Sequence, residues 1–190
     1  MTLEVQQNVL GITEAYIAKI TTNTKTTYET STKMQLPDLS SMEITKNVET
    51  KEAKAGLKVV DSFSIPTGFD VKFENVNIPL DVLALINGSE VKHTGAAGTE
   101  GQTGTQKVSV IETDKQVPVM FNLEAKSDLI NGQAADIHIE MYCVKGTLDV
   151  KTVADDYWTC SFEGKAFARK KDGQYRTITA NETAGTAQTA

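Results

Sequence analysis

From the sequence alone we expect a mainly β fold, an antiparallel β-sandwich or β-barrel flanked by one short α-helix. Three observations predict it: apolar and polar residues alternate with period two along most of the chain, Gly-containing turn signals separate the alternating runs, and one short run has helical spacing. The 190 residues are 39% hydrophobic and 23% charged, which is typical of one folded domain with its own core. We expect that domain to span residues 1–180.

The extended runs follow the chain in a regular order. Residues 14–20, EAYIAKI, are apolar on both parities, as in a strand covered on both faces. Residues 68–75, GFDVKFEN, place Phe69, Val71 and Phe73 on one face and charged residues on the other, as in a half-buried strand. Further strands are expected at 25–31, 57–64, 107–113, 117–127, 135–146, 147–154 and 157–170, with turns at Asn131-Gly132, Lys145-Gly146 and Asp172-Gly173.

One segment, NIPLDVLALING at residues 77–88, interrupts this alternation. Pro79 suits a first helical turn, and Asn87-Gly88 supplies a stop signal. Apolar residues recur between them at helical spacing, namely Leu80, Leu83, Ala84 and Ile86. A helix of about ten residues is marginal alone, so we expect it to lie against a sheet.

Three segments lack a clear apolar period. Residues 36–56 form a long charged stretch, called here the polar arm, whose weak alternation at Met42, Ile44 and Val48 fits an exposed hairpin. An ordinary solvated loop is the alternative. Residues 88–106 are rich in Gly and Thr and predict a flexible loop, and residues 181–190 predict a flexible C-terminal tail.

The stretch ADIHIEMYCVKG, residues 135–146, invites a metal-site interpretation because it holds His138, Glu140 and Cys143. In an extended chain, however, Cys143 shares a face with the isoleucines and points away from His138 and Glu140. The other histidine, His93, lies in the Gly/Thr-rich stretch, so we predict no metal site. Cys143 and Cys160 each fall on an apolar parity, which favours two buried thiols, while a disulfide between them stays open.

Motifs of catalysis and cofactor binding are missing from the sequence. GTEGQTG at residues 98–104 has no following Gly-Lys-Ser/Thr, and Asp155-Asp156 falls in an expected turn. We therefore predict no enzyme, no cofactor and no catalytic, cofactor-binding or metal residues. The net charge of −6, with scattered basic residues, argues against nucleic-acid binding. The N-terminus lacks the pattern of an export signal, and no apolar run approaches the roughly 18 residues that cross a bilayer.

The order of elements along the chain carries a resemblance. GITEAYIAKITTNTKTTYET is followed by the polar arm, then by NVNIPLDVLALING, and late in the chain by VPVMFNLEAKSDLINGQAADIHIEMYCVKGTLDVK and WTCSFEGKAFARKKDGQYRTI. This order, over about residues 10–180, resembles the major tail tube proteins of long-tailed, non-contractile bacteriophages of Gram-positive hosts. No single piece is diagnostic, and the joint order and chain length carry the similarity.

The resemblance implies a structural virion protein. Members of that family fold as a β-sandwich with one helix, form hexameric rings whose inner sheets join into a continuous β-barrel, and stack the rings into a tail tube. Tubes assemble in the bacterial host cytoplasm around a tape-measure protein, with a tail terminator at one end and distal tail or baseplate proteins at the other. DNA only transits the lumen, which an acidic protein would not retain. The polar arm at 36–56 would then be a ring-to-ring contact, mobile in the monomer.

Two other classes of function stay open at this point. A carbohydrate- or cell-surface-binding β-sandwich would need exposed aromatic residues, whereas the chain has 6% aromatics and a single Trp on the same parity as Cys160 and Phe162. A hydrolase would need a nucleophile with its base or paired carboxylates, which the sequence does not display. A tube protein of a contractile tail or a secretion system is a close relative of the main interpretation.

Overall fold

The computed structural model describes residues 9–55, 58–96, 104, 106–129, 136–152 and 157–181. In this part the chain is mainly β with one α-helix, which confirms the predicted fold class. The elements are β1 (Val9–Asn23), β2 (Tyr28–Thr30), β3 (Met34–Gln35), β4 (Leu39–Ala55), β5 (Lys58–Val76), α1 (Leu80–Asn87), β6 (Glu90–Thr94), β7 (Lys107–Ile111), β8 (Phe121–Leu129), β9 (Asp136–Lys151), β10 (Thr159–Ala166) and β11 (Arg176–Asn181).

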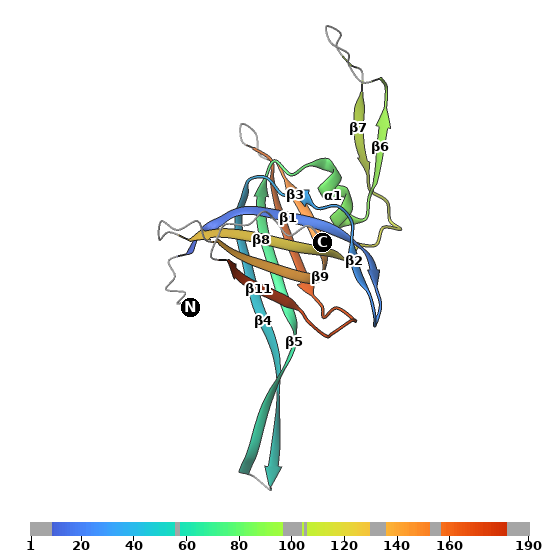
Figure 1. Cartoon of the computed structure of the whole chain (residues 1–190). Coiled ribbons are helices and arrows are strands. Elements are labelled where there is room, and N and C mark those ends of the chain that lie inside the picture. The colour runs from blue at the N-terminus through green and yellow to red at the C-terminus, as the bar shows by residue number, and fades with distance from the viewer. Residues whose placement is uncertain are drawn as a thin grey trace.

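A single curled antiparallel sheet makes up the body of the molecule. Its strand order is β2-β1-β8-β9-β10-β5-β4, with β3 added on β1 and β11 added on β9. The long strand β9 joins two layers, because its residues 136–141 pair with β8 and β11 while its residues 144–151 pair with β10. In Figure 1, β1, β8 and β11 cross over β4 and β5, so the curled sheet resembles a sandwich. Strands β6 and β7 form a separate two-stranded ribbon.

The core lies between the two layers and has an aromatic centre. Phe73 of β5 stacks on Phe162 of β10 with ring centroids 4.6 Å apart, and Phe121 of β8 meets Phe162 edge-on at 5.5 Å. Around them pack other buried apolar residues, among them Ala15, Ile17, Leu36, Phe69, Val71, Leu123, Met141, Val144 and Leu148. The alternation that predicted a one-sided strand at 68–75 is therefore confirmed in the buried face of β5. The strand predicted at 117–127 begins only at Phe121, and β8 is buried on both faces, since Asn122 and Glu124 are buried as well as Phe121 and Leu123.

Helix α1 covers one side of this core. Pro79 is its N-cap, and the N–H of Gly88, a residue with φ of 69°, closes the helix at its C-terminal end. The buried residues are Val82, Leu83, Ala84 and Ile86. Leu80, which the spacing had grouped with the buried side, is 37% exposed, and Val82 occupies the core instead. The predicted helix is thus confirmed with its buried face shifted.

Asn87 ties α1 to the sheet. Its Nδ2 donates to the carbonyl oxygen of Leu148 at 3.1 Å, and the N–H of Leu148 donates to its Oδ1 at 3.0 Å. The pairing of β8 with β9 extends only to Val144, so on this edge of β9 the Asn87 amide takes the place of a neighbouring strand. The amide satisfies two backbone groups that would otherwise be buried without partners.

We expect Asn87→Ala to lower the free energy of unfolding by about 2 kcal/mol, because both backbone groups of buried Leu148 lose their partner. Urea unfolding followed by circular dichroism measures the change. Asn47→Ala, at a half-exposed Asn of β4, is the matched control and should change stability by no more than about 0.5 kcal/mol. Equal losses in the two variants would contradict the role given to Asn87.

Two predicted boundaries inside the sheet are wrong. Residues 57–64 and 68–75 belong to the single strand β5, and residues 135–146 and 147–154 largely to the single strand β9. The predicted turn at Lys145-Gly146 therefore lies within β9, where Gly146 faces Gly164 of β10 across the ladder. Glycine is required here because the Phe162 ring packs against its backbone, and a Cβ at Gly146 would lie only 2.7 Å from Phe162 Cζ.

Of the other turn and loop predictions, one is confirmed, one is partly wrong, and the rest fall outside the described residues. The Asp172-Gly173 turn is confirmed, with φ of 73° at Gly173 and its N–H donating to the carbonyl oxygen of Arg169 at 3.0 Å. The Gly/Thr-rich loop predicted from residue 88 is wrong over β6, which pairs with β7 along its whole length. Asn131-Gly132, Asp155-Asp156, residues 98–103 and the tail beyond Asn181 lie outside the described residues.

The polar arm predicted at 36–56 is a hairpin strand and not a solvated loop. Leu36 belongs to the core, and β4 pairs with β5 from Leu39 to Ala55. Only the distal part of the hairpin leaves the body, as Figure 1 shows. No helix in the described residues is long and apolar enough to cross a membrane.

Candidate assembly surfaces

The distal part of the β4–β5 hairpin is the largest projection of the described chain. We call residues 48–55 and 58–66 the β4–β5 arm. All of its side chains that the structure describes are exposed on both faces of the ribbon, and the arm points away from the sandwich (Figure 1). Eight residues of strand correspond to about 26 Å. A two-stranded ribbon of this length without a covering surface is marginally stable in water.

The arm carries apolar side chains into solvent. Phe63 is 52% exposed and Val60 is 64% exposed, and Val48 and Ile65 are similarly open. Ion pairs on its surface join neighbours on the same strand, as Lys51 Nζ lies 3.7 Å from Glu49 Oε1. Exposed pairs of this kind contribute little to stability, so they do not stabilise the projecting arm as a rigid ribbon. The arm therefore has the composition of a contact surface.

A second ribbon, formed by β6 and β7, projects from the opposite end of the body (Figure 1). Val91 pairs with Val110 and His93 with Val108, so three valines share one face. The other face carries Glu90, Lys92 and Lys107. Val108 remains 38% exposed, and so this one-sided ribbon also presents apolar residues to solvent.

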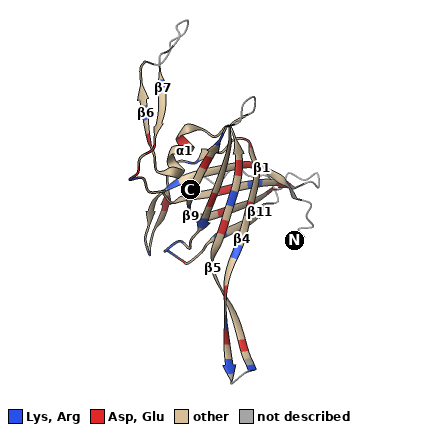
Figure 2. Cartoon of the chain, turned by 180° about the vertical axis from the view of Figure 1, so that it is seen from behind, with Lys and Arg blue, Asp and Glu red and all other residues tan. Residues whose placement is uncertain are grey.

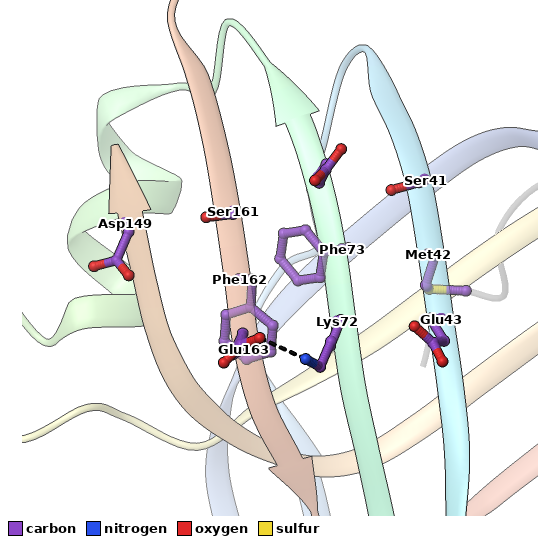
Figure 3. Close-up of a pocket in the computed structure, with 10 residues that line it drawn as sticks. Ser41, Met42, Glu43, Lys72, Phe73, Asp149, Ser161, Phe162 and Glu163 are labelled. Carbon is purple, nitrogen blue, oxygen red and sulfur yellow. Dashed lines mark hydrogen bonds and ion pairs between the residues drawn. The ribbon is translucent and has the colours of Figure 1, made fainter. Parts of the chain in front are cut away.

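The outer face of the layer formed by β4, β5, β10 and the end of β9 is polar, with carboxylates around a cavity and with Lys145 and Lys165 farther along the strands. Ser41, Glu74, Ser161 and Asp149 are neighbours across the four strands, and in the row beside them Glu43, Lys72 and Glu163 follow one another. A shallow cavity of about 330 Å³ lies over these rows (Figure 3). Figure 2 shows red and blue segments on these strands, so the face as a whole carries both signs of charge.

The cavity has only one cation among its lining residues, and that cation is paired. Lys72 Nζ lies 2.6 Å from Glu163 Oε1, and this hydrogen bond raises the pKa of Lys72. Phe73 and Phe162 close its floor from the core side (Figure 3). The cavity therefore offers hydroxyl and carboxylate oxygens, and its charge repels phosphate groups.

A buried network of charged side chains occupies the outer face of β1, β8 and β9. His138 Nδ1 lies 2.8 Å from Glu124 Oε1, and its Nε2 lies 3.2 Å from Asp136 Oδ2 without the alignment of a hydrogen bond. Lys33 pairs with the second oxygen of Glu124. Asn181 donates to Asp136 Oδ1 at 2.7 Å and so ties β11 to the network. These partners compensate the burial of the carboxylates.

The structure separates the residues that had suggested a metal site. Glu140 accepts hydrogen bonds from Asn122 at 2.8 Å and from Tyr142 at 3.0 Å, while His138 turns to Glu124. His93 lies on the exposed β6–β7 ribbon. In the described residues no group of three or more His, Cys, Asp or Glu side chains is placed to hold a metal ion. Sequence reasoning missed the Glu124–His138 pair, because it depends on the register between two strands.

Cys143 lies on a different face from the one that alternation predicted. It has φ of 49°, and the register of β8 with β9 shifts between Phe121 and Leu123, which indicates a β-bulge. The extra residue changes the parity, so Val144 follows Met141 in the core. Cys143 instead accepts a hydrogen bond from Asn23 Nδ2 at 3.2 Å.

Arg169 fixes the connection between β10 and β11 over this bulge. Its guanidinium lies 4.1 Å from the ring centroid of Tyr142 and donates to both carboxylate oxygens of Asp172. That hydrogen bonding raises the pKa of Arg169 and lowers the pKa of Asp172. Tyr28, 5.6 Å from the same guanidinium, is half-buried, and this burial raises its pKa to about 12. The cluster is a packed, internally satisfied support for the loop.

We expect both cysteines to react slowly with iodoacetamide at pH 8 in the native protein. Cys143 and Cys160 are free and buried, and burial raises the pKa of each thiol, so less of the reactive thiolate is present. Each unit of increase in pKa lowers the thiolate fraction roughly tenfold. Mass spectrometry after timed labelling measures this, with urea-unfolded protein as the control that labels at both thiols. Rapid labelling of one native thiol would contradict the structure.

No protein-family model matches the sequence, and no curated protein matches it with significance. The fold and the surfaces described above therefore carry the functional argument.

Proposed function

We propose that the chain is a structural protein that assembles with copies of itself into stacked rings forming a phage tail tube. The observation that carries the proposal is the β4–β5 arm, a long ribbon exposed on both faces that bears apolar side chains and projects from a well-packed sandwich. A monomeric protein gains nothing from such an arm, whereas an assembling protein covers it with a neighbour.

The open sheet edges support lateral association. Among the described strands, β4 pairs with β5 alone and β11 pairs with β9 alone, so each has an edge without a partner strand. Open edges add further strands readily, and closing them in a ring removes the risk of uncontrolled pairing. In this proposal rings close laterally through edges of the body, and arms connect successive rings. The hexameric number comes from the resemblance to tail tube proteins.

The same proposal gives a role to the acidic cavity on the outer face of β4, β5, β10 and β9. Lining the tube lumen, its carboxylates and hydroxyls would repel the phosphates of DNA and let the polymer pass without sticking. The partners are then other copies of the chain, a tape-measure protein, a tail terminator and distal tail or baseplate proteins. The place of the protein is the virion tail, after assembly in the host cytoplasm, and no catalysis is part of the role.

Sedimentation velocity across a wide range of protein concentration tests self-assembly. We expect a monomer at low concentration and discrete rings and larger polymers as concentration rises, because arm and edge contacts follow mass action. A monomer that persists at the highest soluble concentration, also after addition of a preformed tube fragment as seed, would contradict the proposal.

A carbohydrate- or cell-surface-binding module is the second candidate. The parity of Trp158 had counted against it, but the structure places Trp158 at 56% exposure next to Tyr157 at 70%. Exposed aromatic rings are a common feature of sugar-binding surfaces, so this observation favours the alternative. A glycan array with the monomer separates the two functions, since specific binding that is lost in Trp158→Ala, in a protein that does not polymerise, would support the second one.

A further inference from the structure

Apolar side chains are also exposed at the end of the body opposite the β4–β5 arm. Trp158 is 56% exposed, and Val150 and Leu80 are 40% and 37% exposed. Trp158 and Val150 lie near one another because Val150 is the cross-strand partner of Cys160. Leu80 begins α1 shortly after β5, whose last residue Val76 pairs with Thr159. We call Leu80, Val150 and Trp158 the tryptophan end.

Strand β5 connects the two apolar surfaces. It runs from Lys58 at the tip of the arm to Val76, and the next residue, Asn77, donates its N–H to the carbonyl oxygen of Trp158 at 3.3 Å. Nineteen residues of strand span about 60 Å, so the arm of one molecule lies far from its own tryptophan end. A second copy displaced along the strand direction would bring an arm to that end.

We propose that the β4–β5 arm of one copy docks on the tryptophan end of the next copy, with Phe63 covering Trp158. The inference rests on the proposed self-assembly and identifies the surfaces that meet. The charges fit this pairing, because Lys51 is the cross-strand neighbour of Phe63 and the exposed Asp81 follows Leu80. Opposite charges at the rim and apolar rings at the centre are the usual anatomy of a contact.

The docking explains why the assembly would be a tube and not a closed stack. The two surfaces differ, so the contact is heterologous, and two docked copies still have one free arm and one free tryptophan end between them. Repetition along the strand axis then continues until another protein covers an end. Such polymerisation needs no change in the body of the protomer, since both surfaces already project into solvent.

Trp158 provides a direct probe because it is the single tryptophan of the chain. On assembly we expect its emission to shift to shorter wavelength and acrylamide quenching to fall about fivefold, as at an interface core that excludes water. Phe63→Ser should prevent both changes and the assembly of stacks. Val117→Ser, in the connection between β7 and β8, is the matched control with an exposed apolar residue outside these surfaces removed and should assemble with the same spectral shift.

Disulfide trapping gives a second readout that does not depend on fluorescence. In Ser64→Cys/Leu80→Cys protein, which keeps Phe63 and Trp158, oxidation after assembly should give a ladder of covalent multimers, whereas either single variant gives at most dimers. The native thiols are buried and should not contribute. Tubes in which Trp158 stays accessible and no ladder forms would overturn the docking and leave the proposed function standing. Failure to assemble under any condition would overturn both.

Discussion

Replacing residues 48–67 with an Asn-Gly turn should give a folded protomer that no longer forms tubes. Asn47 and Gly68 face each other in the β4–β5 ladder, so a two-residue turn closes the shortened hairpin at the edge of the body. The removed side chains that the structure describes are exposed, and we expect the free energy of unfolding to change by no more than about 1 kcal/mol. A cut starting at residue 40 would also remove the edge strand of the sandwich and is less informative.

Two measurements check this result. Urea unfolding establishes that the shortened protomer is folded, and electron microscopy establishes whether tubes are present. The matched control keeps the arm and its apolar residues but exchanges one ion pair, as Glu52→Lys with Lys54→Glu, and should form normal tubes because exposed pairs contribute little. Tubes of normal length from the shortened protomer would show that the arm has no part in assembly.

Gly164→Ala should destabilise the protomer by about 3 kcal/mol or more, and Gly146→Ala should act in the same direction. A Cβ at Gly164 would lie 2.6 Å from the carbonyl oxygen of Lys145 and would overlap the Phe162 ring, while a Cβ at Gly146 would overlap the carbonyl oxygen of Glu163. The colliding atoms are backbone or a ring stacked in the core, so neither can move away cheaply.

Thermal and urea unfolding of the two variants measure this loss, which is a large part of the 5–15 kcal/mol that holds a typical domain together. Gly11→Ala in β1 is the matched control. No atom lies within 4 Å of a Cβ built there, so its stability should stay within about 0.5 kcal/mol of the parent. Alanine tolerated equally at Gly164 and Gly11 would refute the packing of Phe162 on the glycine pair.

The sequence predicts the elements that depend on local pattern. Alternation alone identified Phe69, Val71 and Phe73 as a buried row, and Pro79 with Gly88 marked the ends of the helix. The same local signals gave wrong predictions where a residue type is required by a contact with a residue that is distant in the sequence. Gly146 has the appearance of a turn residue, but it is glycine because the Phe162 ring lies against it from another strand.

The surfaces were harder to predict than the core. Parity placed Trp158 with Cys160 and Phe162, yet the alternation does not reveal where the covering layer ends, and Trp158 lies beyond it. The bulge at Cys143 and the pairing of His138 with Glu124 depend on the register of β8 against β9, which no single strand encodes. The polar arm was predicted as a segment near residues 36–56, whereas its second strand comes from β5.

The most direct test of the central claim is negative-stain electron microscopy of the purified protein at high concentration, with and without a seed of preformed tube. The account predicts hollow tubes of uniform diameter, built from stacked rings, in the wild-type protein and none in the variant that lacks residues 48–67. Monodisperse particles of protomer size in every wild-type sample would contradict it. That result would favour the carbohydrate- or cell-surface-binding function, with the exposed Trp158 in the binding surface.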